Sequence, residues 1–159
     1  MTQNICGLLE DASERSPENP FFFFRGNPFS YSLCMERVRR LSAWMEGRGV
    51  GPGDRVLLNA GNSPDFICAL FAVLQLGAIA VLANPAYRGY ELEYLIAETS
   101  PSLIVTLPEL MINFMADGRM TALPDSILYT GADGPSPCIG EACAGSARRT
   151  RIESVDPRH

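Results

Sequence analysis

The apolar run at residues 66–83 constrains the fold of this chain more than any other segment. It contains one polar side chain, Gln75, and is long enough to cross a membrane. The flanking residues favour two buried elements instead, because Asn62-Ser63-Pro64-Asp65 is a helix-start sequence and Gly77 is a natural helix stop. No basic cluster flanks the run, as it does beside many membrane helices. We therefore predict a helix that starts at Ser63, followed by a strand at 78–83 buried on both faces.

The same alternation of helical and extended patterns continues in both directions. Apolar residues recur at helical spacing over residues 4–16, 32–48, 90–99 and 108–120, and short apolar runs predict strands at 55–59, 103–106 and 126–130. Residues 21–25 and 29–31 flank Gly26-Asn27-Pro28 and predict a hairpin. Strands separated by helices are typical of right-handed βαβ units, so we predict an α/β fold with a mostly parallel sheet and helices on both faces.

Composition changes after residue 130. Residues 131–159 are rich in Gly, Ala, Pro and Ser, which predicts an irregular tail with at most a short helical turn near 139–147. We therefore divide the chain into an α/β scaffold at 1–130 and an irregular tail at 131–159. Within the scaffold, Trp44 and residues 21–24 are predicted to lie in the core, and Arg55 is predicted to pair with a nearby surface acid.

The charge and the residue inventory exclude several classes of function. A formal net charge of -5 and a pI near 4.9 argue against nucleic acid or an anionic membrane as the main partner, since both attract clustered positive charge. All 13 basic residues are arginine, and the one histidine is His159 at the last position. The chain therefore has no lysine to hold a triphosphate and no histidine base within its fold.

The cysteines predict free thiols rather than disulfides or a metal site. They are Cys6, Cys34, Cys68, Cys138 and Cys143, an odd number without a CxxC pair or a nearby histidine. Free thiols are typical of a reducing cytoplasm, and the first residues show no secretory signal. We accordingly expect a cytoplasmic protein without a membrane span or a bound metal.

A set of short motifs between residues 30 and 106 resembles one protein family. The motifs are Ser30-Tyr31, Gly49-Val50-x-Pro52-Gly53-Asp54-Arg55-Val56, Asn62-Ser63-x-x-Phe66, Leu76-Gly77-Ala78, Asn84-Pro85-x-Tyr87 and Glu91-Leu92-x-Tyr94. Their order and spacing resemble the start of the adenylate-forming (AMP-binding) superfamily, which includes acyl-CoA synthetases, peptide-synthetase adenylation domains and beetle luciferases. The Ala83-Asn84-Pro85 form is most similar to fatty-acyl or aryl-acid CoA ligases.

The resemblance implies the N-terminal subdomain of an adenylate-forming enzyme. Complete members activate a carboxylate with ATP to an acyl-adenylate and pass the acyl group to coenzyme A or a carrier thiol. They use a lysine in a hydroxyl-rich glycine loop around the phosphates and another lysine in a mobile C-terminal domain. Because this chain has no lysine, the resemblance implies no catalytic residue here. ATP, Mg and coenzyme A are implied for the complete enzyme, and none is expected to be bound by this chain.

Residues 127–135 imitate the family's phosphate loop but are not expected to bind phosphate. Asp133 would place a negative charge beside the phosphates, and no lysine offsets it. In the better register, 126–130 is an earlier strand and 150–157 approach the real loop. We therefore expect the tail to be the end of a larger domain, truncated shortly before that loop.

Asn84, Tyr87 and Arg88 are the candidate substrate-binding residues. They follow the predicted strand at 78–83 at its carboxyl end, where open parallel sheets place their ligands. No catalytic or metal-binding residue is assigned in this chain.

Two hypotheses for the function remain open at this point. The first is an N-terminal fragment of an acyl-CoA ligase that is inactive by itself. The second is a stand-alone, non-catalytic scaffold, or a module that binds an acyl group or a partner and derives from that family. Strands expected downstream would leave a sheet edge uncovered, which predicts self-association or a complementing C-terminal half. The sequence leaves open whether the chain alone is an enzyme.

Overall fold

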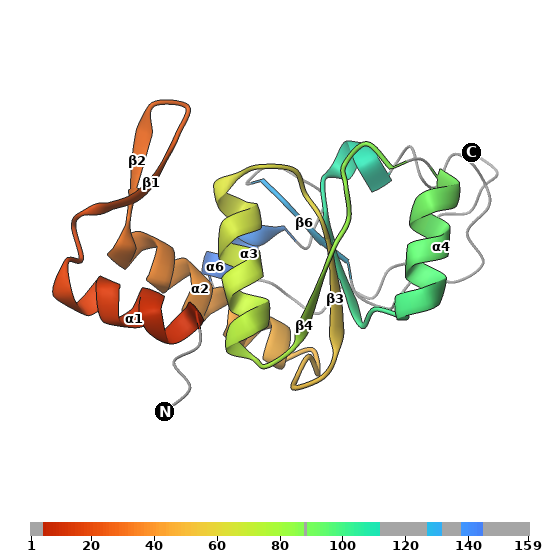
Figure 1. Cartoon of the computed structure of the whole chain (residues 1–159), viewed down its shortest axis with the longest axis horizontal. Helices are drawn as coiled ribbons and strands as arrows, with labels where there is room; N and C mark the ends of the chain where they lie inside the picture. Colours follow the sequence, from red (N-terminus) through yellow and green to blue (C-terminus); the bar gives the residue numbers. More distant parts are fainter. Residues whose placement is uncertain (1–4, 88, 112–126, 132–137, 145–159) are drawn as a thin grey trace.

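The computed structural model describes residues 5–87, 89–111, 127–131 and 138–144 (Figure 1). In chain order the elements are α1 (Ile5–Arg15), β1 (Pro20–Phe24), β2 (Asn27–Ser30), α2 (Tyr31–Glu46), β3 (Arg55–Asn59), α3 (Pro64–Gln75), β4 (Ile79–Leu82), α4 (Gly89–Thr99), β5 (Leu103–Thr106), β6 (Ile127–Tyr129) and α6 (Ile139–Ala144). β1 and β2 form an antiparallel hairpin. The other described strands form a parallel sheet in the order β4-β3-β5-β6, which confirms the predicted α/β fold.

The long apolar run divides into α3 and β4, as predicted. The Ser63 hydroxyl caps α3 by accepting a hydrogen bond from the Phe66 amide at 3.2 Å, and Pro64 is the first helical residue. Gly77 reverses the chain after α3 with a φ of 68°, a conformation that suits glycine. Among the residues that the structure describes, no helix combines the length and the apolarity that crossing a bilayer requires.

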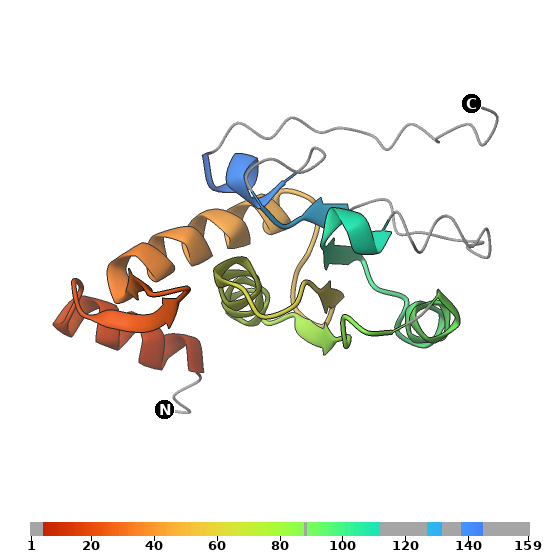
Figure 2. The ribbon, with the colours of Figure 1, turned by 90° about the horizontal axis from the view of Figure 1, so that it is seen from above.

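Helices cover the sheet on both faces (Figure 2). On one face, side chains of α2, α3 and α6 share a core with alternate residues of the strands, among them Val56, Leu58, Leu103, Val105 and Leu128, and α1 packs on α2 and α3. On the other face, Leu92 and Ile96 of α4 pack against Leu57 and Ile104. Because successive strand residues point to opposite faces, each of the central strands β3 and β5 contributes to both cores.

The burial of β4 differs from the prediction. The strand at 78–83 was expected to be buried on both faces, but Ile79 is 52% exposed and Leu82 is 59% exposed. β4 pairs with β3 on one side and lies at the edge of the described sheet, so helices that cover the centre leave these two side chains in solvent, whereas Ala80 and Val81 are half-buried. All four residues of β5, by contrast, are buried.

The position of the turn in the N-terminal hairpin differs from the prediction. Its turn falls at Arg25 and Gly26, which both have positive φ angles of 50° and 81°, so β2 begins at Asn27 rather than at Phe29. The phenylalanine run is only partly in the core, because Phe23 is 67% exposed. A two-stranded hairpin has one face without a covering layer, and this side chain lies on that face.

Among the described residues, Arg55 pairs with backbone carbonyls and not with an acid. Its Nε donates to the Thr99 carbonyl at 2.8 Å and its Nη2 to the Ser100 carbonyl at 3.2 Å. These carbonyls lie at the C-terminal end of α4, where the backbone carries partial negative charge. Arg55 therefore binds the end of α4 to the start of β3.

Residues after 130 contribute to the core. The Ile139 and Ala142 side chains of α6 are each 2% exposed. They belong to the core between the sheet and the helices α2 and α3, which we call the core on the α2 face. Arg40 of α2 donates to the Cys143 carbonyl at 2.6 Å. The predicted division at residue 130 stays a prediction, and residues 132–137 and 145–159 lie outside the described residues.

Candidate functional site

The carboxyl edge of the parallel sheet is the candidate functional site. All strands of a parallel sheet end at the same edge, and open α/β sheets bind ligands there. The loops after β3, β4 and β5 meet at this edge: a β-carbon on Gly61 would lie 3.9 Å from Pro85 Cγ and 4.0 Å from Leu107 Cδ1. Gly61 therefore lies where three loops from separate parts of the sequence come close together, and its φ of 61° is a conformation that favours glycine.

Three strands end in, or lead directly into, a buried polar residue at this edge. Asn59 ends β3, Thr106 ends β5 and Thr130 follows β6, with exposed fractions of 2%, 1% and 4%. Asn59 and Thr106 are partners in the sheet register. Alternation places both on the face covered by α4, because Leu57 and Ile104, two residues earlier, belong to that core.

Two of these side chains carry an oxygen without a hydrogen-bond partner in the described part of the chain, namely Asn59 Oδ1 and Thr130 Oγ1. Leu128 packs in the core on the α2 face, so alternation places Thr130 on the face opposite Asn59. An unpaired buried acceptor costs about 1–3 kcal/mol unless water or a ligand donates to it. The edge therefore offers one unpaired acceptor on each face of the sheet, and the two do not converge on a single point.

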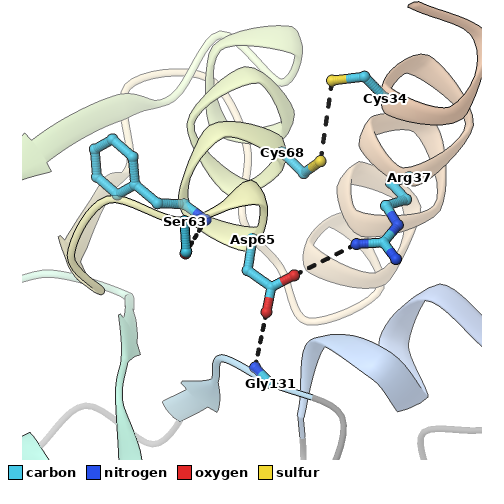
Figure 3. A network of polar contacts seen from close by, with 7 residues as sticks. Cys34, Arg37, Ser63, Asp65, Cys68 and Gly131 are labelled. Atoms are coloured by element: carbon cyan, nitrogen blue, oxygen red, sulfur yellow. Dashed lines mark hydrogen bonds and ion pairs between the residues drawn. The ribbon is translucent and has the colours of Figure 1, made fainter. Parts of the chain in front are cut away.

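Asp65 connects the edge to the helices behind it (Figure 3). Its Oδ2 accepts a hydrogen bond from the Gly131 amide at 2.8 Å, and its Oδ1 lies 3.5 Å from Arg37 Nη1. The carboxylate also lies in the first turn of α3, where the helix dipole favours negative charge. One side chain therefore joins α3, α2 and the residue that follows Thr130.

The described residues do not fit a magnesium–triphosphate group. Gly131 begins the turn that imitates a phosphate loop, and its amide already donates to a carboxylate, which would repel phosphate. The whole chain has no lysine to offset that charge. Within the described ranges, no three His, Cys, Asp or Glu side chains group as metal ligands. The residues 132–135 of the imitated loop lie outside those ranges.

The predicted substrate-binding residues lie at this edge, after β4. The Asn84 side chain accepts a hydrogen bond from the Ala86 amide at 2.9 Å, and its carbonyl accepts one from the Tyr87 amide at 2.9 Å. Asn84 therefore shapes the turn after β4, and Tyr87 is 42% exposed beside it. Arg88 lies outside the described residues. Substrate binding by these three residues stays a prediction.

Sequence reasoning missed Asn59, Thr106, Thr130 and Asp65 as members of the edge. A signal was present, because each of the runs RVLLN, LIVT and ILYT changes from apolar to polar at its last residue. In a parallel sheet such positions all fall on the carboxyl edge.

We predict that Asp65→Asn lowers the free energy of unfolding by about 1 kcal/mol, because it removes the ion pair with Arg37 and weakens the charged acceptor for Gly131. Urea denaturation of the variant and the parent measures the change. The matched control is Glu36→Gln in α2, which breaks an ion pair with Arg40 whose side chains are 57% and 52% exposed. That control is expected to change stability by less than about 0.5 kcal/mol. Equal losses in the two variants would contradict the role given to Asp65.

Comparison with known proteins shows which family the chain matches. Residues 9–149 match the family model described as AMP-binding enzyme. The chain is 36% identical, over 94% of its length, to a salicyl-AMP ligase / salicyl-S-ArCP synthetase of Mycobacterium tuberculosis. It is 29% identical, over 80% of its length, to a long-chain-fatty-acid–CoA ligase of Bacillus subtilis. It covers 28% and 23% of these two proteins, about a quarter of their length.

Solved structures with the same fold include two CoA ligases. A benzoate CoA ligase from Burkholderia xenovorans matches 96% of this chain with a TM-score of 0.78 and 18% identity, over 30% of its own chain. An anthranilate CoA ligase in complex with anthranoyl-AMP matches 93% of this chain with a TM-score of 0.81 and 17% identity, again over 30% of its own chain. At these identities the likeness concerns the fold.

Proposed function

Because the chain belongs to the AMP-binding enzyme family, we propose that it forms the N-terminal scaffold of an acyl-CoA ligase. In the complete enzyme, ATP would convert a carboxylic acid to an acyl-adenylate, and coenzyme A would then take the acyl group as a thioester. The proposal rests mainly on the family match at 9–149, which includes every described strand. The names of the relatives support a fatty or aryl acid as the substrate, and hence a place in fatty acid metabolism or a related acid-activating reaction.

In this proposal the described residues support the acid and do not perform the chemistry. ATP, Mg and coenzyme A belong to the complete enzyme, and the parts that hold them lie outside this scaffold. The turn of Asn84, Tyr87 and Arg88 would contact the acid at the carboxyl edge of the sheet. We also propose a cytoplasmic setting, which is supported by five cysteines that form no disulfide.

We further propose that another segment covers the β4 edge, either from a complementing C-terminal half or from a second copy. The support is that β4 has exposed apolar residues, Ile79 and Leu82, and carries no charge or proline to block pairing. The chain alone is therefore expected to self-associate, so its weight-average mass in light scattering should rise with concentration. Ile79→Lys places a charge at the edge and should reduce that rise. A monodisperse monomer at every concentration would contradict this prediction.

The test of the proposed function is complementation in trans. This chain is mixed with the remainder of the Bacillus subtilis relative, that is, the part beyond its match to this chain, and ATP–pyrophosphate exchange is measured with fatty and aryl acids. Exchange that needs both pieces would support the proposal. As a control, the remainder is also mixed with the N-terminal piece of its own protein, and exchange is expected there. If that control is active but this chain gives no exchange, whether or not it associates with the remainder, the result would favour the alternative of a non-catalytic module derived from the family.

A further inference from the structure

Two thiols from different helices meet in the core beside the candidate site. Cys34 Sγ of α2 and Cys68 Sγ of α3 lie 4.0 Å apart, and both residues are 0% exposed (Figure 3). They are 34 residues apart in the sequence. Neither thiol has a role in the proposed function, so their proximity calls for a separate account.

The two helices hold the sulfurs in place. Arg37 and Asp65, each three residues from one of the cysteines, form the ion pair between α2 and α3. Farther along the same helices, the Ser42 hydroxyl donates to Gln75 Oε1 at 3.2 Å. Because these contacts fix one helix against the other, the thiols stay close without a search through other conformations. A disulfide needs an S–S distance of about 2.05 Å, so each sulfur has to move by only about 1 Å.

The surroundings shift the pKa values of the two thiols in opposite directions. The hydrogen bond between the thiols lowers the pKa of Cys34, and the nearby Arg37 guanidinium lowers it further, although burial opposes both. The same hydrogen bond and burial raise the pKa of Cys68. Of the two thiols, Cys34 is therefore the one whose ionisation its surroundings favour. Thiolates, rather than thiols, attack oxidants and disulfides.

We propose that Cys34 and Cys68 form an oxidisable dithiol whose product is an intramolecular disulfide between α2 and α3. The oxidant is a peroxide, for which hydrogen peroxide is the probe. The Cys34 thiolate attacks one peroxide oxygen, so an S–O bond forms, the O–O bond breaks and hydroxide leaves. The Cys68 thiol then gives up its proton and its sulfur attacks the Cys34 sulfenic acid, so the S–S bond forms and the S–O bond breaks. The departing hydroxide and the Cys68 proton form water, and the two sulfurs have lost two electrons to the peroxide.

The disulfide would change the stability of the chain in a measurable way. It closes the loop between residues 34 and 68, which restricts the unfolded chain, and a loop of this length is expected to raise the midpoint of thermal unfolding by roughly 8 °C. Because both sulfurs are inaccessible, the reaction is expected to wait for local opening of the helix pair and to be slow in the folded protein.

The test is peptide mapping of the purified full chain after exposure to hydrogen peroxide. Cleavage after arginine gives peptides 26–37 and 56–88, each with a single cysteine. The expected product is these two peptides joined, with the loss of two hydrogen atoms, and a thermal midpoint that rises and returns after reduction with dithiothreitol. Oxidation of the other cysteines while Cys34 and Cys68 remain thiols would overturn the proposal, as would a link from either residue to another cysteine.

Variants separate the disulfide from other effects of the oxidant. Cys34→Ala and Cys68→Ala should each abolish the rise in thermal midpoint, whereas Cys143→Ala should retain it, because Cys143 lies on α6, outside the pair. Where a core alanine prevents folding, the peptide map of the parent chain decides alone. A rise of the same size in Cys34→Ala would show that the stabilisation has another source and would overturn the assignment.

Discussion

The purified chain is expected to catalyse no ATP–pyrophosphate exchange above the blank with any carboxylic acid. Adenylation needs positive charge and positioned donors around the triphosphate, and removing one such group already costs about 10²–10³ in rate. This chain has no lysine, and the Gly131 amide already donates to Asp65. Exchange of labelled pyrophosphate into ATP, followed with fatty and aryl acids at high enzyme concentration, measures the result.

The positive control for this experiment is the benzoate CoA ligase from Burkholderia xenovorans, assayed with benzoate in the same buffer. Exchange that co-purifies with this chain at constant specific activity, and that falls in Tyr87→Ala, would contradict the expectation. Such a result would mean that a carboxylate can be activated without a lysine, and the chain would then be an enzyme in its own right.

Replacing Leu58 with alanine is expected to lower the free energy of unfolding by about 3 kcal/mol. Leu58 lies in the central strand β3, is 0% exposed and belongs to the core on the α2 face, so its loss leaves a cavity between the sheet and the helices. Small domains have a total stability of about 5–15 kcal/mol, so the loss is a large share of the whole. Urea denaturation followed by circular dichroism gives the change in the midpoint.

The sheet provides a matched control for this substitution. Leu82 of β4 is the direct register partner of Leu58 but is 59% exposed. At a protein concentration where light scattering shows a monomer, the same change, Leu82→Ala, removes the same atoms from a position that is in solvent, and is expected to cost less than about 1 kcal/mol. Similar losses at the two positions would show that β4 is covered in solution, for example by a second copy of the chain.

The strands could be located from the sequence because strong punctuation bounds them. The predicted ranges 55–59 and 103–106 agree with β3 and β5, since Gly51-Pro52-Gly53-Asp54 and Pro101 fix where each run begins. The burial of β4 could not be derived in the same way. A short apolar run looks alike in the centre and at the edge of a sheet, and the order β4-β3-β5-β6 follows from pairing that the sequence does not display.

Of the candidate site, only residues that directly follow a predicted strand in the sequence could be predicted. Asn84 and Tyr87 were located because they come directly after a predicted strand. Asn59 and Thr106 become neighbours through strand register, which brings together residues from distant parts of the sequence. The Arg55 prediction was wrong for a related reason: its partners are carbonyls at the end of α4, and no side chain in the sequence marks them.

The contact between α2 and α6 has a consequence for how the chain acquires its structure during synthesis. Arg40 and Cys143 are hydrogen-bonded although 103 residues separate them. α2 therefore leaves the ribosome well before the helix that covers part of its buried surface has been translated. Until Ile139 and Ala142 have been translated, α2 lacks the α6 part of its core, so we expect the N-terminal helices and β3 to form a partial core first. β6 and α6 are translated later and then complete this core. The last described segment of the chain therefore packs against helices that are made at its start.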